Sequence, residues 1–525
     1  MDIIFRVDAS FQMGTGHVIR CLTLAEELKE SGANVGFICR KHKGNLINKI
    51  QSEGFNVFEL EIMKRDKCDN KLLYSHWLGT TQQQDARGCI NILQQTKVDW
   101  LIVDHYGIDE DWQQELKDYY DKLMVIDDLA DRKHQCNILL DQTFGRQLQD
   151  YKALVPKSCE LLLGLQYSLL RPEFSKWRKY SIERRKHPVL KQLLIHMGGM
   201  DINNITEQVL KVLAISNLQK DINITVVMGK LAPHLESIKK RLDDFPFNID
   251  VKVNVDNMAE IMANADIAIG SSGTTTWERC CLGLPSIQII TAKNQEFSAR
   301  ILAKNKVIKL IKSIEDIPNL LRTFPDWMLD ICNMSASICD GSGTFSTTRR
   351  MLIYKINTDK FGELELHNYN YLDIDEKILA LDMRNHPDIN KWMHNSSDIS
   401  KSTHLAFIDG LKGDMSRLYF LVKQQGKIIG SINFTDIVRP HYVELGIYTN
   451  PFDQLKGSGN VLEAAANYFA FEELRVNKLR LEVFSNNKRA INFYNTSGYK
   501  LIETKIVNNR EIFCLEKKIV SRKTR

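Results

Sequence analysis

A glycine-rich turn followed by a histidine lies near the start of the chain, at Gly14, Gly16 and His17. An apolar run over residues 3–7 precedes the turn and apolar residues recur at helical spacing after it, so it joins a buried strand to a helix. Glycine lets the backbone approach a ligand closely, and the free N–H groups of a helix N-terminus favour an anion. The positive end of the helix dipole favours a neutral imidazole, which can accept a proton. The pattern therefore predicts that His17 is a base beside a phosphate-type site.

Packing alone is the competing interpretation of this turn. Most strand–glycine–helix units are Rossmann-like packing, and the sequence G-T-G-H lacks the third glycine of a dinucleotide-binding fingerprint. A histidine that stands alone at such a turn is more often structural than catalytic. The other motifs of the chain shift the balance toward catalysis.

A second segment rich in glycine and hydroxyl groups covers residues 270–278, with the sequence G-S-S-G-T-T-T-W-E. Ser271 and Ser272 stand in a loop before a predicted helix, where hydroxyl and N–H groups can hold a phosphate. Glu278 lies one helical turn beyond Thr274, where a carboxylate can accept hydrogen bonds from a ribose diol. The alternative is a capped helix with an exposed glutamate.

Four further residues are placed to reach the same ligand. Tyr106 and Gly199 follow predicted strands, and Asn294 and Gln295 begin the helix after the next strand. Because the carboxyl ends of parallel strands meet at one edge of a sheet, we expect all four to face one cleft between two nucleotide-binding halves.

A third constellation lies near the C-terminus. Gln454, Gly457 and Gly459 form a Q-x-x-G-x-G loop between a strand and an apolar helix, and consecutive N–H groups of such a loop can hold a pyrophosphate. About 30 residues later, Asn487 and Tyr494 stand in an N-x-x-A-x-x-x-Y segment. Tyr494 is a candidate part of this site, and a core aromatic is the alternative.

Composition limits the class of protein. The chain has 525 residues, of which 43% are hydrophobic and 26% charged, which is typical of several soluble domains. No apolar run is long enough to cross a membrane, and the first residues lack the layout of a signal peptide. The 11 cysteines include no C-x-x-C pair, and the histidines have no metal-ligand spacing. The net charge of +5 suits anionic small molecules rather than nucleic acid. We expect a cytoplasmic location, no membrane, no nucleic acid and no metal.

The order of predicted elements indicates an α/β protein with three domains. Strands and helices alternate over two successive segments, as in parallel sheets with helices on both faces. We expect Rossmann-like domains over residues 1–180 and 181–355, joined by a charged linker near residues 171–190. A third domain is expected over residues 364–520, where two strands pair around Gln425 and Gly426.

Several motifs of the first two segments occur in a recognisable order. They read R-V-D-A-S, G-T-G-H-V-x-R-C-L-x-L-A, V-D-H-Y, I-D-D-L-A-D-R, G-G-M-D-x-N, G-S-S-G-T-T-T-W-E and D-G-x-G. On these motifs, residues 1–350 resemble the UDP-sugar hydrolases of pseudaminic acid biosynthesis, which are themselves similar to GT-B glycosyltransferases. The resemblance implies a GT-B-like pair of Rossmann-like domains and removal of UDP from UDP-2,4-diacetamido-2,4,6-trideoxy-β-L-altropyranose.

The same resemblance implies roles for individual residues. His17 would be the base that activates water at the anomeric carbon, and Tyr106 would lie near the sugar. Ser272, Glu278 and Asn294 would hold UDP. The loop has an additional G-T-T between Ser272 and Trp277, which leaves open which hydroxyl contacts phosphate.

The ordered set of strand, Q-x-x-G-x-G, helix, strand, N-x-x-A-x-x-x-Y and G-Y resembles the GNAT acetyltransferases. The resemblance covers residues 364–520 and implies acetyl-CoA as cosubstrate. Gly457 and Gly459 would bind its pyrophosphate, Asn487 would contact the CoA arm, and Tyr494 would be the general acid. Glu444, on the strand before the loop, is a candidate base acting through water, and a solvated strand residue is the equal alternative.

The combined resemblance implies a bifunctional enzyme that acetylates N4 of a UDP-4-amino-4,6-dideoxy sugar and then removes UDP. Two alternatives stay open at this point. The first is a GT-B glycosyltransferase fused to a GNAT domain of other specificity, and the second is the equivalent pair of steps in a legionaminic-type pathway. Arg384, Trp392 and His404 are candidates for a sugar or UDP pocket in the third domain, with a structural role as the equal alternative.

Overall fold

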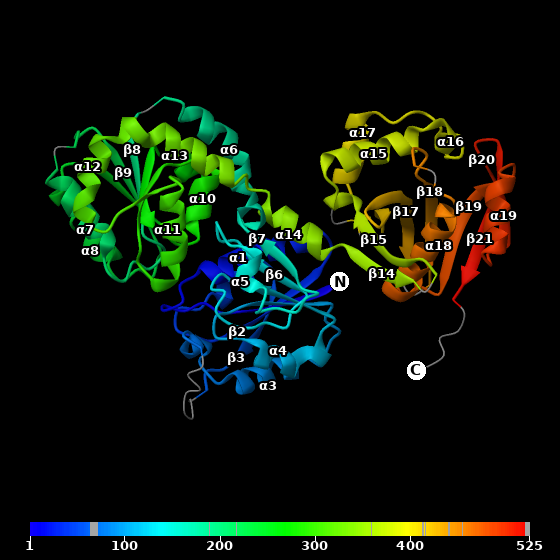
Figure 1. Ribbon diagram of the computed structural model, residues 1–525, viewed down its shortest axis with the longest axis horizontal. Helices are drawn as coiled ribbons and strands as arrows, with labels where there is room; N and C mark the ends of the chain where they lie inside the picture. Colours follow the sequence, from blue (N-terminus) through cyan, green and yellow to red (C-terminus); the bar gives the residue numbers. More distant parts are fainter. Residues whose placement is uncertain are drawn as a thin grey trace. The chain divides into compact units, whose positions relative to one another are not determined.

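The computed structural model describes residues 1–63, 72–187, 189–216, 218–358, 360–411, 414, 416–438, 441–453 and 455–519. The chain divides into two compact units: unit 1 comprises Met1–Leu28 and Ala33–Thr347, and unit 2 comprises Thr348–Arg525 together with the short segment Lys29–Gly32. Unit 1 runs from blue to green in Figure 1 and holds two parallel sheets, whereas unit 2 runs from yellow to red and holds one mixed sheet.

The first sheet of unit 1 has seven parallel strands in the order β3-β2-β1-β4-β5-β6-β7. Its strands are β1 (Asp2–Val7), β2 (Asn34–Arg40), β3 (Asn56–Leu60), β4 (Trp100–Asp104), β5 (Lys122–Ile126), β6 (Ile138–Asp141) and β7 (Glu160–Leu163). Its helices are α1 (Gly16–Glu30), α2 (Ile47–Ser52), α3 (Gln82–Leu93), α4 (Glu110–Leu116) and α5 (Leu148–Tyr151). Val7 pairs with Asp104, so the loops that follow β1 and β4 leave the sheet side by side.

The second sheet of unit 1 has six parallel strands in the order β10-β9-β8-β11-β12-β13. Its strands are β8 (Gln192–His196), β9 (Asn223–Met228), β10 (Asn248–Val253), β11 (Ile267–Ser271), β12 (Ser286–Ile289) and β13 (Lys309–Leu310). Its helices are α6 (Pro172–Arg184), α7 (Ile205–Ala214), α8 (Leu235–Lys239), α9 (Met258–Asn264), α10 (Thr275–Cys281), α11 (Glu296–Lys304), α12 (Ile317–Arg322) and α13 (Phe324–Ile338). The next helix, α14 (Gly343–Met351), contains the boundary between the two units.

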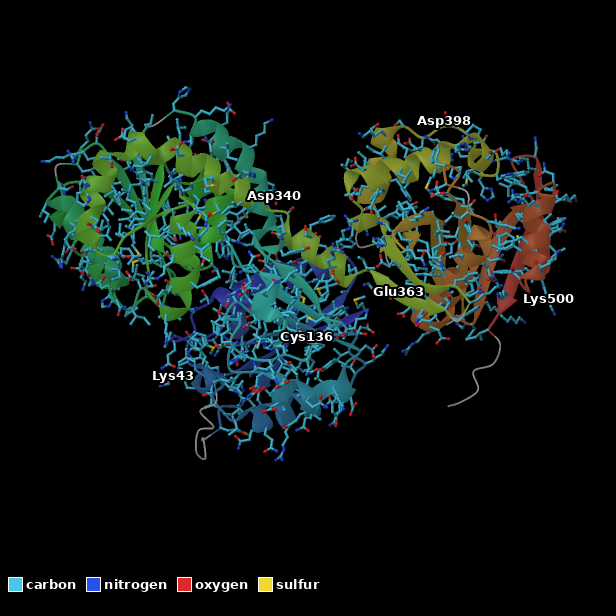
Figure 2. The ribbon with its side chains drawn as sticks, in the orientation of Figure 1. Lys43, Cys136, Asp340, Glu363, Asp398 and Lys500 are labelled. Carbon is cyan, nitrogen blue, oxygen red and sulfur yellow. The ribbon has the colours of Figure 1, made fainter. Side chains whose placement is uncertain are left out.

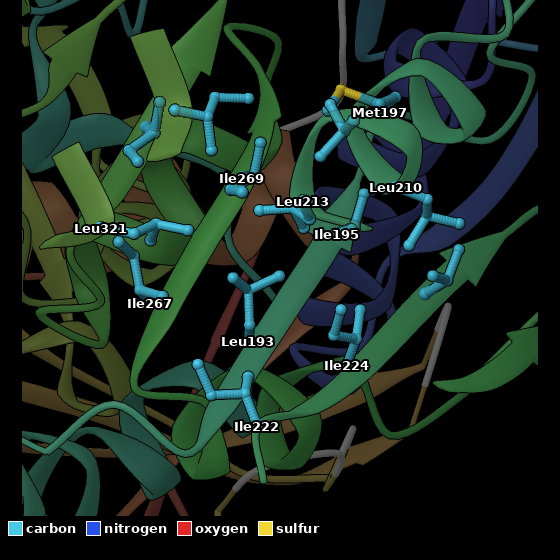
Figure 3. Close-up of a cluster of buried hydrophobic side chains, with 14 of the residues drawn as sticks. Leu193, Ile195, Met197, Leu210, Leu213, Ile222, Ile224, Ile267, Ile269 and Leu321 are labelled. Atoms are coloured by element: carbon cyan, nitrogen blue, oxygen red, sulfur yellow. The ribbon is translucent and has the colours of Figure 1, made fainter. Parts of the chain in front are cut away.

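Alternation along each strand of the second sheet directs side chains to two cores. Leu193 and Ile195 of β8 pack with Leu210 and Leu213 of α7 on one face, as Figure 3 shows. Leu194, which lies between them in sequence, packs on the other face with residues of α6, α9, α10 and α11. Helices on both faces leave only the strand ends and their loops to form a site.

The charged segment that we expected to be a linker is largely the helix α6. Pro172 occupies its first turn, where proline is tolerated, and Phe174 and Ser181 are buried. None of the charged residues of this helix is fully buried, and Lys176, Lys179 and Glu183 are exposed, which is why composition alone indicated a linker.

The D-G-S-G segment before α14 is a tight structural turn. Asp340 accepts hydrogen bonds from the N–H and the hydroxyl of Ser342, at 2.9 and 2.7 Å, and is labelled in Figure 2. A Cβ at Gly343 would collide with the backbone of Ser168. This motif therefore fixes packing within unit 1 rather than binding a ligand.

Unit 2 is built on an eight-stranded sheet in the order β14-β15-β16-β17-β18-β19-β21-β20. Its strands are β14 (Tyr354–Thr358), β15 (Gly362–Asn368), β16 (Leu418–Gln424), β17 (Lys427–Val438), β18 (Tyr442–Thr449), β19 (Lys478–Phe484), β20 (Lys500–Val507) and β21 (Arg510–Lys518). Its helices are α15 (Ile374–Asn385), α16 (Pro387–Asn390), α17 (Lys401–Asp409), α18 (Ser458–Tyr468) and α19 (Lys488–Thr496). The α18 side chains pack on one face of the sheet and those of α15 and α17 on the other.

One interruption in this sheet matters for function. β18 and β19 are parallel and pair only at three positions, the last being Glu444 with Arg480. Beyond Glu444 the two strands no longer pair, although β18 stays paired to β17 on its other side. The backbone groups of β18 that face β19 are therefore available to an extended ligand.

Candidate functional site

Unit 1 contains a cleft of about 1130 Å³ whose lining comes from both sheets. It brings together all ten residues that the sequence placed in a UDP-sugar site: Gly14, Gly16, His17, Tyr106, Gly199, Ser271, Ser272, Glu278, Asn294 and Gln295. The two glycine-rich loops approach each other closely, because a Cβ at Gly16 would lie 3.3 Å from the hydroxyl of Thr274. Gly14 has a φ of 75°, a conformation that favours glycine.

His17 is held in one orientation by a buried carboxylate. Its Nδ1 lies 2.6 Å from Oδ1 of Asp104, the last residue of β4, and both side chains are buried. A carboxylate can only accept, so Nδ1 carries the proton and Nε2 keeps a lone pair. This is the arrangement of a histidine that is ready to take a proton on Nε2.

Arg20, one turn further along α1, fixes that carboxylate. It donates from Nε to Asp104 Oδ2 at 2.6 Å and from Nη2 to Oδ1 at 2.7 Å, a two-point contact. Burial raises the pKa of Asp104, but the charges of Arg20 and His17 outweigh burial and hold that pKa below its usual range. Asp104 therefore remains a carboxylate at neutral pH.

The network continues to the predicted sugar residue. Arg20 Nη1 contacts Asp128 Oδ2 at 3.0 Å, and the other oxygen of Asp128 accepts a short hydrogen bond from the hydroxyl of Tyr106. Burial, and secondly the charge of Asp128, raises the pKa of Tyr106, so the phenol stays protonated. The Tyr106 ring lies edge-on to His17 with centroids 4.6 Å apart, and Trp77 stacks on Tyr106 at 5.5 Å.

The loop after β11 offers polar groups that have no partner. The Ser272 hydroxyl is buried and makes no hydrogen bond. Half-buried Glu278 lines the same cleft, and burial raises the pKa of its carboxyl to about 7. Arg171, at the start of α6, also lines the cleft and has a buried Nε without a partner. Unsatisfied buried groups of this kind mark a place where a ligand completes the hydrogen bonding.

Two predicted residues make contacts of their own. The Gln295 side-chain oxygen accepts from the N–H of Thr291 at 2.9 Å, so this residue also shapes its loop. Gly199 accepts from the N–H of Gly229 at 3.0 Å, while the space where its Cβ would stand is open.

In unit 2 the predicted pyrophosphate loop begins α18. Gly457 is the residue before the helix, with a φ of 91° and open space at its Cβ position. A Cβ at Gly459 would lie 3.6 Å from the ring of Phe493, next to Tyr494 on α19. Gln454 lies outside the described residues.

The candidate acid and the CoA-contact residue both belong to α19. Burial raises the pKa of Tyr494, which keeps its hydroxyl protonated, and its ring packs edge-on to Tyr499 with centroids 5.4 Å apart. Asn487 caps the helix by accepting from the N–H of Ala490 at 3.1 Å. Its amide nitrogen and the second lone pair of its oxygen are left for a ligand.

Glu444, the candidate base, stands where β18 and β19 part. Burial raises the pKa of its carboxyl, and the nearby carboxylates of Glu482 and Asp436 raise it further. Glu482 lies on β19, two residues beyond the partner of Glu444, and pairs with His394 at 3.1 Å and with Lys505. Carboxylates gathered in this way attract a cationic amine.

Sequence reasoning missed several of these residues. Arg20 and Asp104 stood inside quoted motifs, and their pairing appears only when β1 and β4 lie side by side. Arg171 was hidden in the supposed linker, and no sequence signal identified Glu482 or His394. Arg384 and His404 contact backbone oxygens instead: Arg384 those of Asn395 and Ser397, and His404 that of Lys377 at 3.0 Å.

Comparison with known proteins agrees with this division. Residues 193–323 match the glycosyltransferase family 28 C-terminal domain, and residues 380–499 match the acetyltransferase (GNAT) family. The UDP-2,4-diacetamido-2,4,6-trideoxy-beta-L-altropyranose hydrolase of Campylobacter jejuni is 30% identical over 305 residues, which is 58% of this chain and 97% of that protein. Acetyltransferase PseH of C. jejuni is 37% identical over 140 residues, 27% of this chain and 87% of PseH. The chain therefore belongs to the families of these two relatives, the UDP-2,4-diacetamido-2,4,6-trideoxy-beta-L-altropyranose hydrolases and the PseH-type acetyltransferases.

The predicted fold class is thereby confirmed: a GT-B-like pair of Rossmann-like domains precedes a GNAT α/β domain. The chain spans about half, 55%, of protein MJ1062 of Methanocaldococcus jannaschii, to which it is 30% identical over 291 residues. The crystal structure of C. jejuni PseH in complex with acetyl coenzyme A is 29% identical, with a TM-score of 0.24, over 30% of this chain and 98% of that one.

The described part of the chain contains neither a membrane-spanning helix nor a metal-binding cluster. None of its helices has the length and apolar character needed to cross a membrane. Within the same residues, no cluster of three or more His, Cys, Asp or Glu side chains is arranged to hold a metal ion.

Proposed function

We propose that unit 1 hydrolyses the glycosyl–phosphate bond of a UDP-activated diacetamido sugar. The observation that carries this proposal is the oriented His17 at the bottom of a cleft lined by unsatisfied polar groups. A positioned base and a well-stabilised leaving group are sufficient for such a hydrolysis, and no covalent nucleophile is required.

In the proposed step a water molecule is the nucleophile. Its oxygen bonds to the anomeric carbon while the bond from that carbon to the phosphate oxygen of UDP breaks. His17 Nε2 takes a proton from the water, and Asp104 stabilises the resulting imidazolium. UDP leaves as the anion, so the charges balance without a metal.

The leaving group is held by the second sheet. Ser271 and Ser272 are assigned to the diphosphate, and Glu278 and Asn294 to the uridine. Tyr106, fixed by Asp128, is assigned to the sugar beside the reacting carbon. These assignments rest on the resemblance of the motifs to the UDP-sugar hydrolases, and the lining of one cleft by all these residues supports them.

We propose further that unit 2 transfers an acetyl group from acetyl-CoA to a sugar amine. The amine nitrogen attacks the thioester carbon, the carbon–sulfur bond breaks, and Tyr494 protonates the departing thiolate. Glu444 accepts the proton of the amine through water. Gly457 and Gly459 hold the pyrophosphate, and the unpaired edge of β18 receives the pantetheine arm.

The two reactions fit together as consecutive steps. Acetylation of a UDP-4-amino-4,6-dideoxy sugar at N4 gives the diacetamido sugar, and hydrolysis then releases UDP. The relatives of the two units support this order, because one is a hydrolase of the UDP-diacetamido sugar and the other an acetyltransferase.

Labelled water tests the hydrolase assignment against the glycosyltransferase alternative. The diacetamido UDP-sugar is incubated with the chain in H₂¹⁸O, and the products are analysed by mass spectrometry. We expect ¹⁸O in the free sugar and none in UDP. Label in UDP would show attack at phosphorus, and absence of turnover without a sugar acceptor would favour a transferase.

A further inference from the structure

One buried arginine of unit 1 lacks a counter-ion. Arg279, on α10, is 1% exposed and forms no ion pair with any residue that the structure describes. Its Nη2 donates to the carbonyl of Ser271 at 2.6 Å and to the hydroxyl of Thr276 at 3.1 Å. Its Nε and Nη1 have no hydrogen-bond partner. A buried charge left in this state costs free energy unless something compensates it.

The guanidinium lies directly beneath the loop that lines the cleft. It bonds the backbone of Ser271, and a Cβ at Gly270 would collide with its Nη1. The neighbouring residue Ser272 has a buried hydroxyl that is also without a partner. Two independent groups, the Arg279 guanidinium on α10 and the Ser272 hydroxyl on the loop above it, are thus unsatisfied next to each other.

The surroundings do not neutralise this charge. The carboxylate that acts on Arg279 is that of Glu278, the preceding residue; burial raises its pKa to about 7, so it carries only part of a negative charge at neutral pH. His196, at the end of β8, is kept neutral because burial, and secondly the charge of Arg279, lowers its pKa to about 4. Burial also lowers the pKa of Arg279 to about 10, which still leaves it protonated at neutral pH.

We propose that Arg279 is the electrostatic partner of the diphosphate in the cleft, acting from below the loop without touching the ligand. The inference rests on the proposed UDP site and adds a residue to it. A dianionic diphosphate over Ser271 and Ser272 would compensate the cation across a medium of low polarity, where charges interact strongly. Arg279 is therefore a positioning residue for the leaving group, with an effect that grows with ligand charge.

Another buried arginine provides a matched control. Arg185 is also buried without an ion pair, and burial lowers its pKa to about 10. All its N–H groups reach oxygen atoms, including the carbonyls of Ala265 at 2.6 Å and Leu282 at 3.0 Å. Its charge is satisfied by the protein itself, so it has no need of a ligand.

The test compares ligands that differ only in phosphate charge. Dissociation constants of uridine, UMP and UDP are measured for the full chain and for Arg279→Met, Arg279→Gln, Arg279→Lys and Arg185→Met. We expect Arg279→Met and Arg279→Gln to weaken the binding of UDP by about tenfold or more. The binding of UMP should be weakened less, and that of uridine by under twofold. The dissociation constants of Arg279→Lys should fall between those of these variants and those of the wild type. Arg185→Met should change the affinity for all three ligands equally.

Other outcomes distinguish the proposed role of Arg279 from the diphosphate site of the proposed function. If Arg279→Met does not fold, Arg279→Gln decides, because its amide retains hydrogen-bond donors at this position while the charge is removed. Equal loss of uridine and UDP, or unchanged UDP binding, in that variant overturns the inference. Wild-type chain that binds uridine as tightly as UDP overturns the diphosphate site of the proposed function itself.

Discussion

The two candidate bases of this chain are prepared in opposite ways. In unit 1, His17 is oriented by a buried ion-pair network of Asp104 and Arg20, whose contacts to the Asp104 carboxylate are 2.6 to 2.7 Å long. In unit 2, Glu444 stands at the end of a strand pairing and is tuned by burial and by neighbouring carboxylates. The first base depends on geometry and the second on its electrostatic surroundings.

This difference teaches what each reaction demands. Hydrolysis of a sugar nucleotide needs a water aimed at one carbon, so a fixed imidazole serves it well. Acetyl transfer begins from a cationic amine, which a cluster of acidic groups attracts and a carboxylate of raised pKa can deprotonate. Substitutions in the two units should therefore fail differently.

Removal of the unit 1 base has the largest expected effect. His17→Asn should lower UDP release by 10²–10⁴-fold, because general-base catalysis typically contributes that much. Its UDP affinity should stay within about twofold, since the proposed mechanism assigns His17 to the reacting water rather than to UDP. Steady-state rates and calorimetry measure the two quantities.

The exposed His187 serves as the control. His187→Asn should leave UDP release unchanged. A His17→Asn chain that retains more than about a tenth of wild-type turnover would contradict the role of His17 as base.

The second largest effect is expected when the carboxylate of Asp104, which orients His17, is removed. Asp104→Asn should reduce UDP release by about 10²-fold or more, because an amide can donate to Nδ1 and force the proton onto Nε2. The double variant with His17→Asn should be no slower than His17→Asn alone, since the two residues act as one unit. If the rate loss of the double variant equals the product of the two single losses, Asp104 acts independently of His17.

Disruption of the predicted pyrophosphate loop of unit 2 should impair acetyl transfer without affecting UDP release by unit 1. Gly457→Val places a branched side chain at a φ of 91° in the predicted pyrophosphate loop, so the KM for acetyl-CoA should rise about tenfold or more. Gly362→Val, at a φ of 69° in an open hairpin turn, is the matched control. Loss of UDP release in a folded Gly457→Val chain would contradict the independence of the units.

The smallest expected effect is a change in pH dependence. Glu444 is active as the carboxylate, so acetyl transfer should rise with pH through a pKa above the usual glutamate range. Glu482→Gln removes one of the charges that raise this pKa, and the acidic limb should move to lower pH by less than about one unit. An acidic limb that stays in place in Glu482→Gln, or persists in Glu444→Gln, would exclude Glu444 as the titrating group.

The sequence predicted the loops of the sites better than the contacts inside them. Gly14, Gly16 and the residues from Ser271 to Glu278 could be placed because strand, glycine turn and helix fix where a loop lies. The contact of His17 with Asp104 joins residues 87 apart, and it exists because β1 and β4 are neighbours in a strand order that periodicity does not specify. The role of Arg171 was missed for a related reason, since the charged surface of α6 concealed its helical pattern.

In unit 2 the sequence placed Glu444 on a strand but did not predict that its pairing with β19 ends there. Strand divergence depends on twist and on the packing of α18, neither of which a local motif encodes. The acidic neighbours of Glu444 were missed for the same reason, because Glu482 reaches it only across that strand pair.

The two proposed reactions are linked because we expect unit 1 to prefer the acetylated sugar that unit 2 produces. An unacetylated amine is cationic at neutral pH and costly to desolvate, and a missing acetamide leaves pocket groups unpaired. Unit 1 should therefore act slowly on the substrate of unit 2 and rapidly on its product.

The most direct test of this account follows UDP and CoA release separately from a UDP-4-amino-4,6-dideoxy sugar, with and without acetyl-CoA. We predict slow UDP release without acetyl-CoA, and rapid UDP release that lags behind CoA once acetyl-CoA is added. Equal rates of UDP release under the two conditions would contradict the claim that the first unit consumes the product of the second.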